Sequence, residues 1–211
     1  MKCVATSYHI TVRCTPVVHE MYSPYSAFDN NPIYYVDPSG ANSENEDKSD
    51  LNDKKKAAVT GAAEGAVKHV KDTYDKNGSC GAQCNRGVNH AFTTLTGSNE
   101  LKGLKANEIY DKLPNSDNFE EVEFTEVLDL ANKGEVIIGA WKAKSGSGHV
   151  VMAVPGSKGS GTWDYEKSSK IPQVMDTGSG MRSSKQGANN SYGKAKQGVV
   201  LLFIWFLKIK T

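Results

Sequence analysis

The sequence has few cysteines, no long apolar run and no excess of charge of either sign. Its four cysteines in 211 residues are too few for a disulfide framework. The longest apolar run, residues 199–207, is too short to cross a bilayer, so we expect no membrane insertion and predict a buried strand there. With 25 basic and 24 acidic side chains, the net charge of +1 gives no reason to expect a nucleic-acid partner.

The first residues also lack the pattern of a signal peptide. Residues 1–16 contain one lysine, but threonine, histidine and arginine interrupt every apolar stretch. If the protein leaves its cell, we therefore expect secretion without a signal peptide. The hydrophobic content of 38% predicts a modest core with many loops.

Composition divides the chain into three parts. Residues 1–40 are aromatic and rich in turn residues, and they do not have the apolar content for a core of their own. Residues 41–56 are polar and charged and are predicted to be a solvated linker. Residues 57–211 are expected to form the compact domain.

Hydrophobic periodicity changes within that domain. Apolar residues first recur at helical spacing and later in short runs typical of strands. The predicted helices cover about residues 57–77, 84–96, 106–113 and 124–133. The predicted strands cover residues 135–141, 149–154, 162–165, 171–175 and 199–208, with residues 178–193 as a loop. Helices followed by an antiparallel sheet predict an α+β domain with N-terminal helices packed on a small sheet.

Two residues in this pattern suggest nucleophilic chemistry. Cys84 begins a predicted helix, where unpaired backbone N–H groups stabilise a thiolate. His149 begins a predicted strand within the sequence GSGHVVMAV. A thiol of ordinary pKa, ~8.5, is mostly protonated at neutral pH, so it needs a base such as His149. The pair predicts a covalent hydrolase of amide bonds.

Such a site also needs a residue that orients His149 and donors for the oxyanion. Asp176, just beyond a predicted strand, is favoured as the residue that orients His149, with Asp164 as its rival. The Cys84 backbone N–H is a natural oxyanion donor, and the side chains of Gln83 and Asn77 are both open as the second donor.

Several alternatives and accessory roles accompany this prediction. Cys80 is a second candidate nucleophile, but the helix continues better from Cys84. A disulfide between Cys80 and Cys84 is a further alternative. For a zinc site the pair lacks a second pair of ligands at the usual spacing, and His90 falls on a different helix face from Cys84, so neither a metal nor another cofactor is predicted. We expect Asn85, Gly148 and Trp141 to contact substrate, although each also has a structural explanation.

Residues 31–40, NPIYYVDPSG, resemble the motif that closes the β-repeat shell of Rhs (YD-repeat) proteins. In that family a variable toxin domain follows the motif. The resemblance implies that residues 1–40 are the end of such a shell. It also implies delivery by a contact-dependent machine such as a type VI secretion system, and a cognate immunity protein as partner.

Residues from about 75 to 207 resemble papain-like amidases and peptidases of the CHAP and NlpC groups. The similarity lies in the order of the nucleophile helix, starting at Cys84, and the Gly-His-Val strand at His149. It implies a papain-like cysteine hydrolase fold and hydrolysis of peptidoglycan stem peptides. With the first resemblance, it implies an antibacterial effector that acts in the periplasm or cell wall of a target bacterium.

Two other functions remain open at this point. The same cysteine and histidine would serve a protein-modifying toxin, such as a protease, a deamidase or a transglutaminase-like enzyme. A degenerate, non-catalytic binding module on the same fold is the other alternative.

Overall fold

The computed structural model describes residues 48–75, 80–158, 161–163, 166–168, 170–193 and 201–205. Residues 1–40, Asn77 and Asp164, on which some of the predictions fall, lie outside the described residues. The helices are α1 (Lys48–Tyr74), α2 (Cys84–Thr96), α3 (Ala106–Lys112), the 3₁₀ helix η4 (Leu113–Asn115), α4 (Phe124–Asn132) and α5 (Ala188–Ser191).

The main sheet has the strand order β1-β8-β2-β3-β6-β7, and every neighbouring pair is antiparallel. Its strands are β1 (Phe119–Glu121), β2 (Ile137–Trp141), β3 (His149–Ser157), β6 (Pro172–Asp176), β7 (Ser183–Gly187) and β8 (Leu201–Trp205). The hairpin β4 (Gly161–Trp163) and β5 (Glu166–Ser168) forms a second, two-stranded sheet. The prediction of an α+β domain with a small antiparallel sheet is confirmed.

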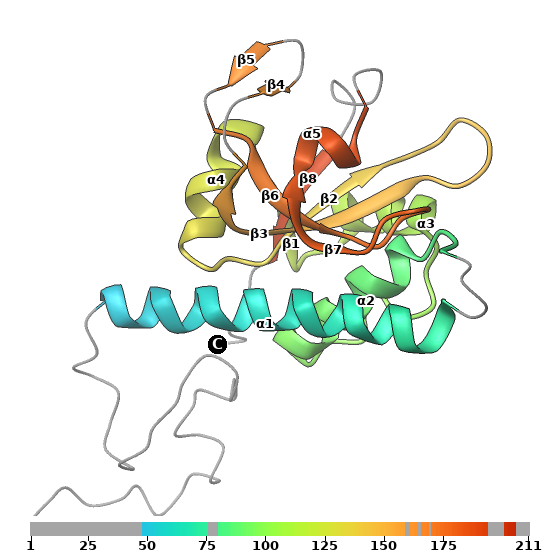
Figure 1. The fold of residues 1–211 in the computed structure, drawn as a ribbon, viewed down its shortest axis with the longest axis horizontal. Coiled ribbons are helices and arrows are strands. Elements are labelled where there is room, and N and C mark those ends of the chain that lie inside the picture. The colour runs from blue at the N-terminus through green and yellow to red at the C-terminus, as the bar shows by residue number, and fades with distance from the viewer. Residues whose placement is uncertain are drawn as a thin grey trace, which may run out of the picture.

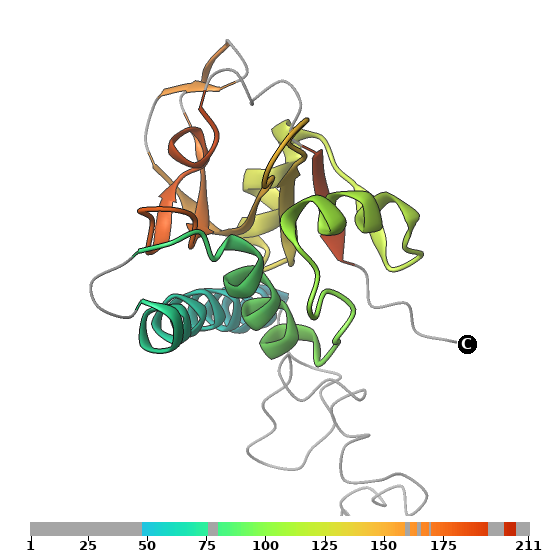
Figure 2. The ribbon, with the colours of Figure 1, turned by 90° about the vertical axis from the view of Figure 1, so that its right-hand side faces the viewer.

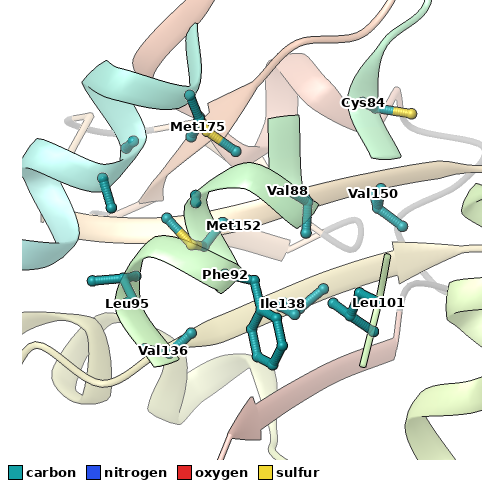
Figure 3. Packing of buried hydrophobic residues seen from close by; sticks show 14 of the residues in the cluster. Cys84, Val88, Phe92, Leu95, Leu101, Val136, Ile138, Val150, Met152 and Met175 are labelled. Carbon is teal, nitrogen blue, oxygen red and sulfur yellow. The ribbon is translucent and has the colours of Figure 1, made fainter. Parts of the chain in front are cut away.

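One face of the sheet packs against α1 and α2, which lie side by side (Figures 1 and 2). Side chains alternate between the two faces of a strand, so Ile138 on β2 and Val150 and Met152 on β3 point toward these helices. They meet Val88 and Phe92 of α2 in the main core, and Figure 3 shows this packing. This core holds α2, and therefore Cys84 at its start, against the sheet.

The intervening residues of these strands face the other side of the sheet. Ile137 and Ala153 pack against Val127 and Ala131 of α4. Beside them Val151 on β3 belongs to a further cluster, with Val174, Ala188 and Tyr192. Helices thus cover both faces, and the sheet is buried along its middle strands.

The helix that was predicted to begin near residue 57 begins earlier in the structure. Helix α1 begins at Lys48, so the last part of the predicted linker is helical. Lys55 forms an ion pair with Glu135 at 3.3 Å, and its backbone packs so closely on Gly134 that a Cβ there would overlap it. Lysine and aspartate are compatible with helix, and the linker prediction gave their polarity too much weight.

The prediction of a loop over residues 178–193 is also wrong. This segment contains β7, which pairs with β6, and the short helix α5. Strand β7 has the sequence SSKQG, which lacks apolar alternation, so its backbone pairing with β6 defines it.

In the described residues, no helix combines the length and apolarity that a membrane span requires.

Candidate active site

Cys84 occupies the first position of α2. The Gln83 carbonyl accepts hydrogen bonds from the N–H groups of Arg86 and Gly87, each at 3.0 Å, which closes the first turn of the helix. The N–H of Cys84 lies at the helix start, where no carbonyl of the same helix is available to it. In Figure 3 the Cys84 sulfur lies at the edge of the core cluster and points away from the other labelled side chains.

The strand register places His149 and Asp176 on one face of the sheet. Met152 of β3 pairs with Met175 of β6, so the next pair along brings Val151 beside Asp176. Residues directly paired across strands share a face, as do alternate residues along a strand. His149 and Asp176 therefore project from the same side, at the same end of the two strands.

The side chains meet there. The His149 Nε2 atom lies 3.1 Å from Asp176 Oδ2. Because Asp176 occupies Nε2, the other ring nitrogen, Nδ1, is the one that remains for a thiol. Cys84 lines the same pocket as His149 and Asp176, and its interaction with the ring contributes to a raised pKa of His149. The structure thus brings together Cys84, His149 and Asp176, the arrangement that nucleophilic thiol catalysis requires.

The electrostatics of the site favour a protonated His149 ring. Burial opposes the charged ring, but hydrogen bonds to Asp176 and Cys84 and attraction to both groups raise its pKa to about 9. The histidine side chain is 14% exposed and that of Asp176 is 1% exposed. An imidazolium so placed can donate a proton to a group bound beside it.

Backbone and amide donors hold the Asp176 carboxylate. Oδ1 accepts a hydrogen bond from the Gly178 N–H at 2.7 Å, and Oδ2 accepts one from Gln186 Nε2 at 2.9 Å. Burial raises the pKa of Asp176, but the hydrogen bonds and the charge of His149 outweigh it, so the pKa is lowered. Asp176 is therefore ionised and fixed in orientation. Gln186 was not predicted, because it lies in the segment assigned to a loop.

Tyr192 is a second residue beside His149 that the sequence analysis missed. Its buried ring meets the His149 ring edge to face, with centroids 5.4 Å apart, and its hydroxyl donates to the Gly139 carbonyl at 2.8 Å. The ring thus supports the imidazole from one side. Tyr192 is the lone aromatic residue of segment 178–193, and this was the sequence feature that could have indicated a buried, packed side chain there.

An open groove in two lobes passes over Cys84. One lobe, of about 340 Å³, is lined by His149, Trp141, Ser179 and Asn190 among others. The other, of about 320 Å³, is lined by residues of α3 and by Asn85. Both lobes are lined by Ala82, Cys84, Ser147 and Gly148, so Cys84 lies where the two meet.

The predicted substrate contacts all line this groove, and each also has a structural partner. The Asn85 amide donates to the Leu104 carbonyl at 2.8 Å. Trp141 pairs with His149 in the β2–β3 register. A Cβ at Gly148 would overlap the Trp141 carbonyl oxygen and the Asn107 side chain, so packing requires glycine at that position.

The rival residues have other environments. Cys80 is a free, half-buried thiol whose carbonyl accepts from the Gly180 N–H, and it does not line either lobe among the described residues. His90 stacks on His69 between α1 and α2, with centroids 4.2 Å apart. Gln83 contributes backbone hydrogen bonds to Thr177 but is not among the described residues that line the groove.

Comparison with known proteins adds no relative. No protein-family model matches the chain, and no curated protein matches it. Within the described residues, no cluster of three or more histidine, cysteine or acidic side chains could hold a metal. The arrangement of Cys84, His149 and Asp176 is equipped for acyl transfer through a thioester, with the groove to hold the substrate on both sides of the sulfur.

Proposed function

We propose that this protein is a papain-like cysteine amidase or peptidase that hydrolyses amide bonds of peptidoglycan stem peptides. The observation that carries the proposal is that Cys84, His149 and Asp176 line the same lobe of an open groove, with His149 hydrogen-bonded to Asp176. The papain-like assignment is supported by the nucleophile at the start of a helix that packs on an antiparallel sheet, with the histidine and aspartate on adjacent strands.

The geometry suggests the following reaction. The Cys84 thiolate attacks the substrate carbonyl carbon, a C–S bond forms, and the oxyanion takes a hydrogen bond from the Cys84 N–H at the start of α2. Protonated His149 gives its Nδ1 proton to the leaving nitrogen as the C–N bond breaks, which leaves a thioester. Neutral His149 then takes a proton from water as that water attacks. The C–S bond breaks, the acid is released, and thiolate and imidazolium are restored.

Each side of the groove has a part in this reaction. His149 lines one lobe, so the amine that it protonates leaves into that lobe. The acyl part of the substrate then occupies the other lobe, which includes Asn85. A groove open on both sides of the sulfur suits cleavage within an extended peptide.

The biological setting is part of the proposal and depends on the Rhs-like motif at residues 31–40. The protein would be an antibacterial effector delivered by type VI machinery, active in the periplasm or cell wall of the target. A cognate immunity protein would then cover the groove.

Digestion of purified sacculi tests the proposed function. We expect the protein to release new amine and carboxyl ends from sacculi or muropeptides, Cys84→Ala to release none, and Cys80→Ala to act as wild type. Periplasm-directed expression should be toxic for wild type and harmless for Cys84→Ala. Intact sacculi combined with a Cys84-dependent modification of a protein substrate would instead establish the protein-modifying alternative, and toxicity unchanged in Cys84→Ala would exclude catalysis by this thiol.

A further inference from the structure

Two short segments meet beside the candidate active site, and we call their junction the seam: residues 80–83, which precede Cys84, and residues 177–182, which follow Asp176. The Gln83 N–H donates to the Thr177 carbonyl at 3.0 Å, and the Thr177 hydroxyl donates back to the Gln83 carbonyl at 3.1 Å. The Gly180 N–H donates to the Cys80 carbonyl at 2.9 Å. The seam therefore sets where the nucleophile lies relative to His149 and Asp176.

One side chain, Arg182, spans the whole seam. Its Nη1 donates to the carbonyls of Thr177, Gly178 and Met181 at 3.0, 2.8 and 2.5 Å. Its Nη2 donates to the Gly81 carbonyl, across the seam, at 2.8 Å. The Arg182 side chain is 7% exposed, so these contacts are largely shielded from water.

The guanidinium is itself oriented by Asp75, just after α1. Arg182 Nε lies 2.6 Å from Asp75 Oδ2, and Nη2 lies 2.5 Å from Oδ1, which makes the pair bidentate. The hydrogen bond from Arg182 lowers the pKa of Asp75 and outweighs the effect of burial. A planar guanidinium can bind a carboxylate and several carbonyls at once, whereas a lysine ammonium cannot reproduce that fork.

The contacts of Arg182 lead to both halves of the site. Gly178, whose carbonyl Arg182 holds, donates its N–H to Asp176, and it packs against His149. Gly81, also held by Arg182, belongs to the segment that leads into Cys84. A displacement of either segment would change the separation of sulfur and imidazole.

We propose that Arg182, oriented by Asp75, is a positioning residue that holds Cys84 in register with His149 and Asp176. The inference rests on the proposed function and deepens it. Arg182 touches no reacting atom, so it acts through the distance and orientation of the Cys84 thiolate relative to the His149 imidazolium. Misplacement of reacting groups by about 1 Å can reduce a rate by about 100-fold.

Alkylation of Cys84 by iodoacetamide tests this without a substrate. The rate is measured from pH 5 to 9 on the full chain, and peptide mass spectrometry counts Cys84 and Cys80 separately. The variants are Arg182→Gln and Asp75→Asn. The control is Lys142→Gln. This variant breaks an exposed ion pair, in which Lys142 Nζ lies 2.6 Å from Asp111 Oδ2, and neither residue belongs to the seam. Thermal unfolding is recorded for every variant.

We expect wild-type Cys84 to react faster than Cys80 at pH 6. Arg182→Gln should slow Cys84 at pH 6 by 10- to 100-fold and move its pH profile toward that of an ordinary thiol, whose pKa is ~8.5. Asp75→Asn should act in the same direction more weakly, and Lys142→Gln should not change the profile.

The inference is overturned if a folded Arg182→Gln keeps the wild-type profile and only unfolds at lower temperature. Should Arg182→Gln not fold, Asp75→Asn decides, and an unchanged profile overturns the inference. A wild-type Cys84 that reacts no faster than Cys80 would contradict the proposed function, and this inference with it. A fast wild-type Cys84 with unaltered variants would contradict the positioning role and leave the proposed function in place.

Discussion

At the scale of single residues, the pairing of His149 with Asp176 determines which protonation state the site holds. The pKa of His149 is raised to about 9 by contacts with Asp176 and Cys84 against the opposing effect of burial. A raised pKa in the folded state means that the folded protein binds the proton more tightly than the unfolded chain does. Protonation of His149 and stability are therefore linked.

We expect that linkage in the free energy of unfolding. The stabilisation from His149 is fully present below its ordinary pKa of 6.5 and is lost as the pH rises through about 9. The loss is on the order of 3 kcal/mol. Chemical denaturation of wild type and His149→Gln at several pH values measures it. If the difference between the two proteins is constant from pH 6 to 9.5, the ion pair is absent.

Gly178 tests how closely the site is packed. A Cβ at this position would lie 2.8 Å from His149 Cε1 and 3.0 Å from Asp176 Oδ1, so Gly178→Ala must displace the ring or the carboxylate. We expect kcat/KM to fall by about 100-fold. Gly193→Ala is the matched control, because a Cβ there meets nothing within 4 Å. Equal activity of the two variants would contradict the described geometry.

At the scale of secondary structure elements, α2 carries Cys84, while His149 and Asp176 lie on strands β3 and β6. The helix and the sheet meet at Gly87, where a Cβ would overlap the Thr177 side chain. A glycine inside a helix usually costs about 0.5–1 kcal/mol relative to alanine. The close approach of α2 to Thr177 explains why glycine occupies this position despite that cost.

Alanine substitutions in two helices separate propensity from packing. We expect Gly61→Ala in α1, where a Cβ meets nothing, to stabilise the protein by about 0.5–1 kcal/mol. Gly87→Ala should instead destabilise it, by about 1–3 kcal/mol, because the helix must move away from Thr177. Thermal and urea unfolding measure both. Stabilisation by Gly87→Ala would show that α2 does not approach the seam as described.

The elements that the sequence predicted well are those whose own side chains define them. Helix α2 was predicted from the spacing of Val88, Phe92 and Leu95, and its end from Gly97, which has φ of 68° at the C-cap. Asp176 was favoured because it follows a predicted strand, and the register of β3 and β6 brings it to His149.

The elements that the sequence missed depend on partners elsewhere in the chain. Strand β7 has no apolar alternation, and it forms through backbone pairing with β6. Gln186, which lies on it, could therefore not be connected with Asp176 in advance. The hydrogen bonds of the Arg182 guanidinium to Asp75 and Gly81 likewise join segments that are distant in sequence, so no local pattern indicates them.

At the scale of the whole molecule, the boundary of the domain follows from the packing of α1. Its first turns, within the predicted linker, contact the turn before β2 through Lys55, Gly134 and Glu135. The folded domain therefore includes residues from Lys48 onward.

Two shortened chains test this boundary. We expect a chain beginning at Lys48 to retain the activity and the Tm of the full protein. A chain beginning at Ala57 loses the contacts of Lys55, and we expect its Tm to be a few degrees lower, equivalent to about 1–2 kcal/mol. Equal Tm values for the two shortened chains would contradict the assignment of residues 48–56 to the domain.

The covalent intermediate is the most direct test of catalysis by Cys84. Wild type and Cys84→Ala are mixed with soluble muropeptides, quenched in acid within milliseconds to seconds, and analysed by intact mass and peptide mapping. We predict an added acyl fragment on the peptide that contains Cys84 in the wild type and no adduct in the variant. Product release by Cys84→Ala at the wild-type rate, or an adduct confined to Cys80, would contradict the account.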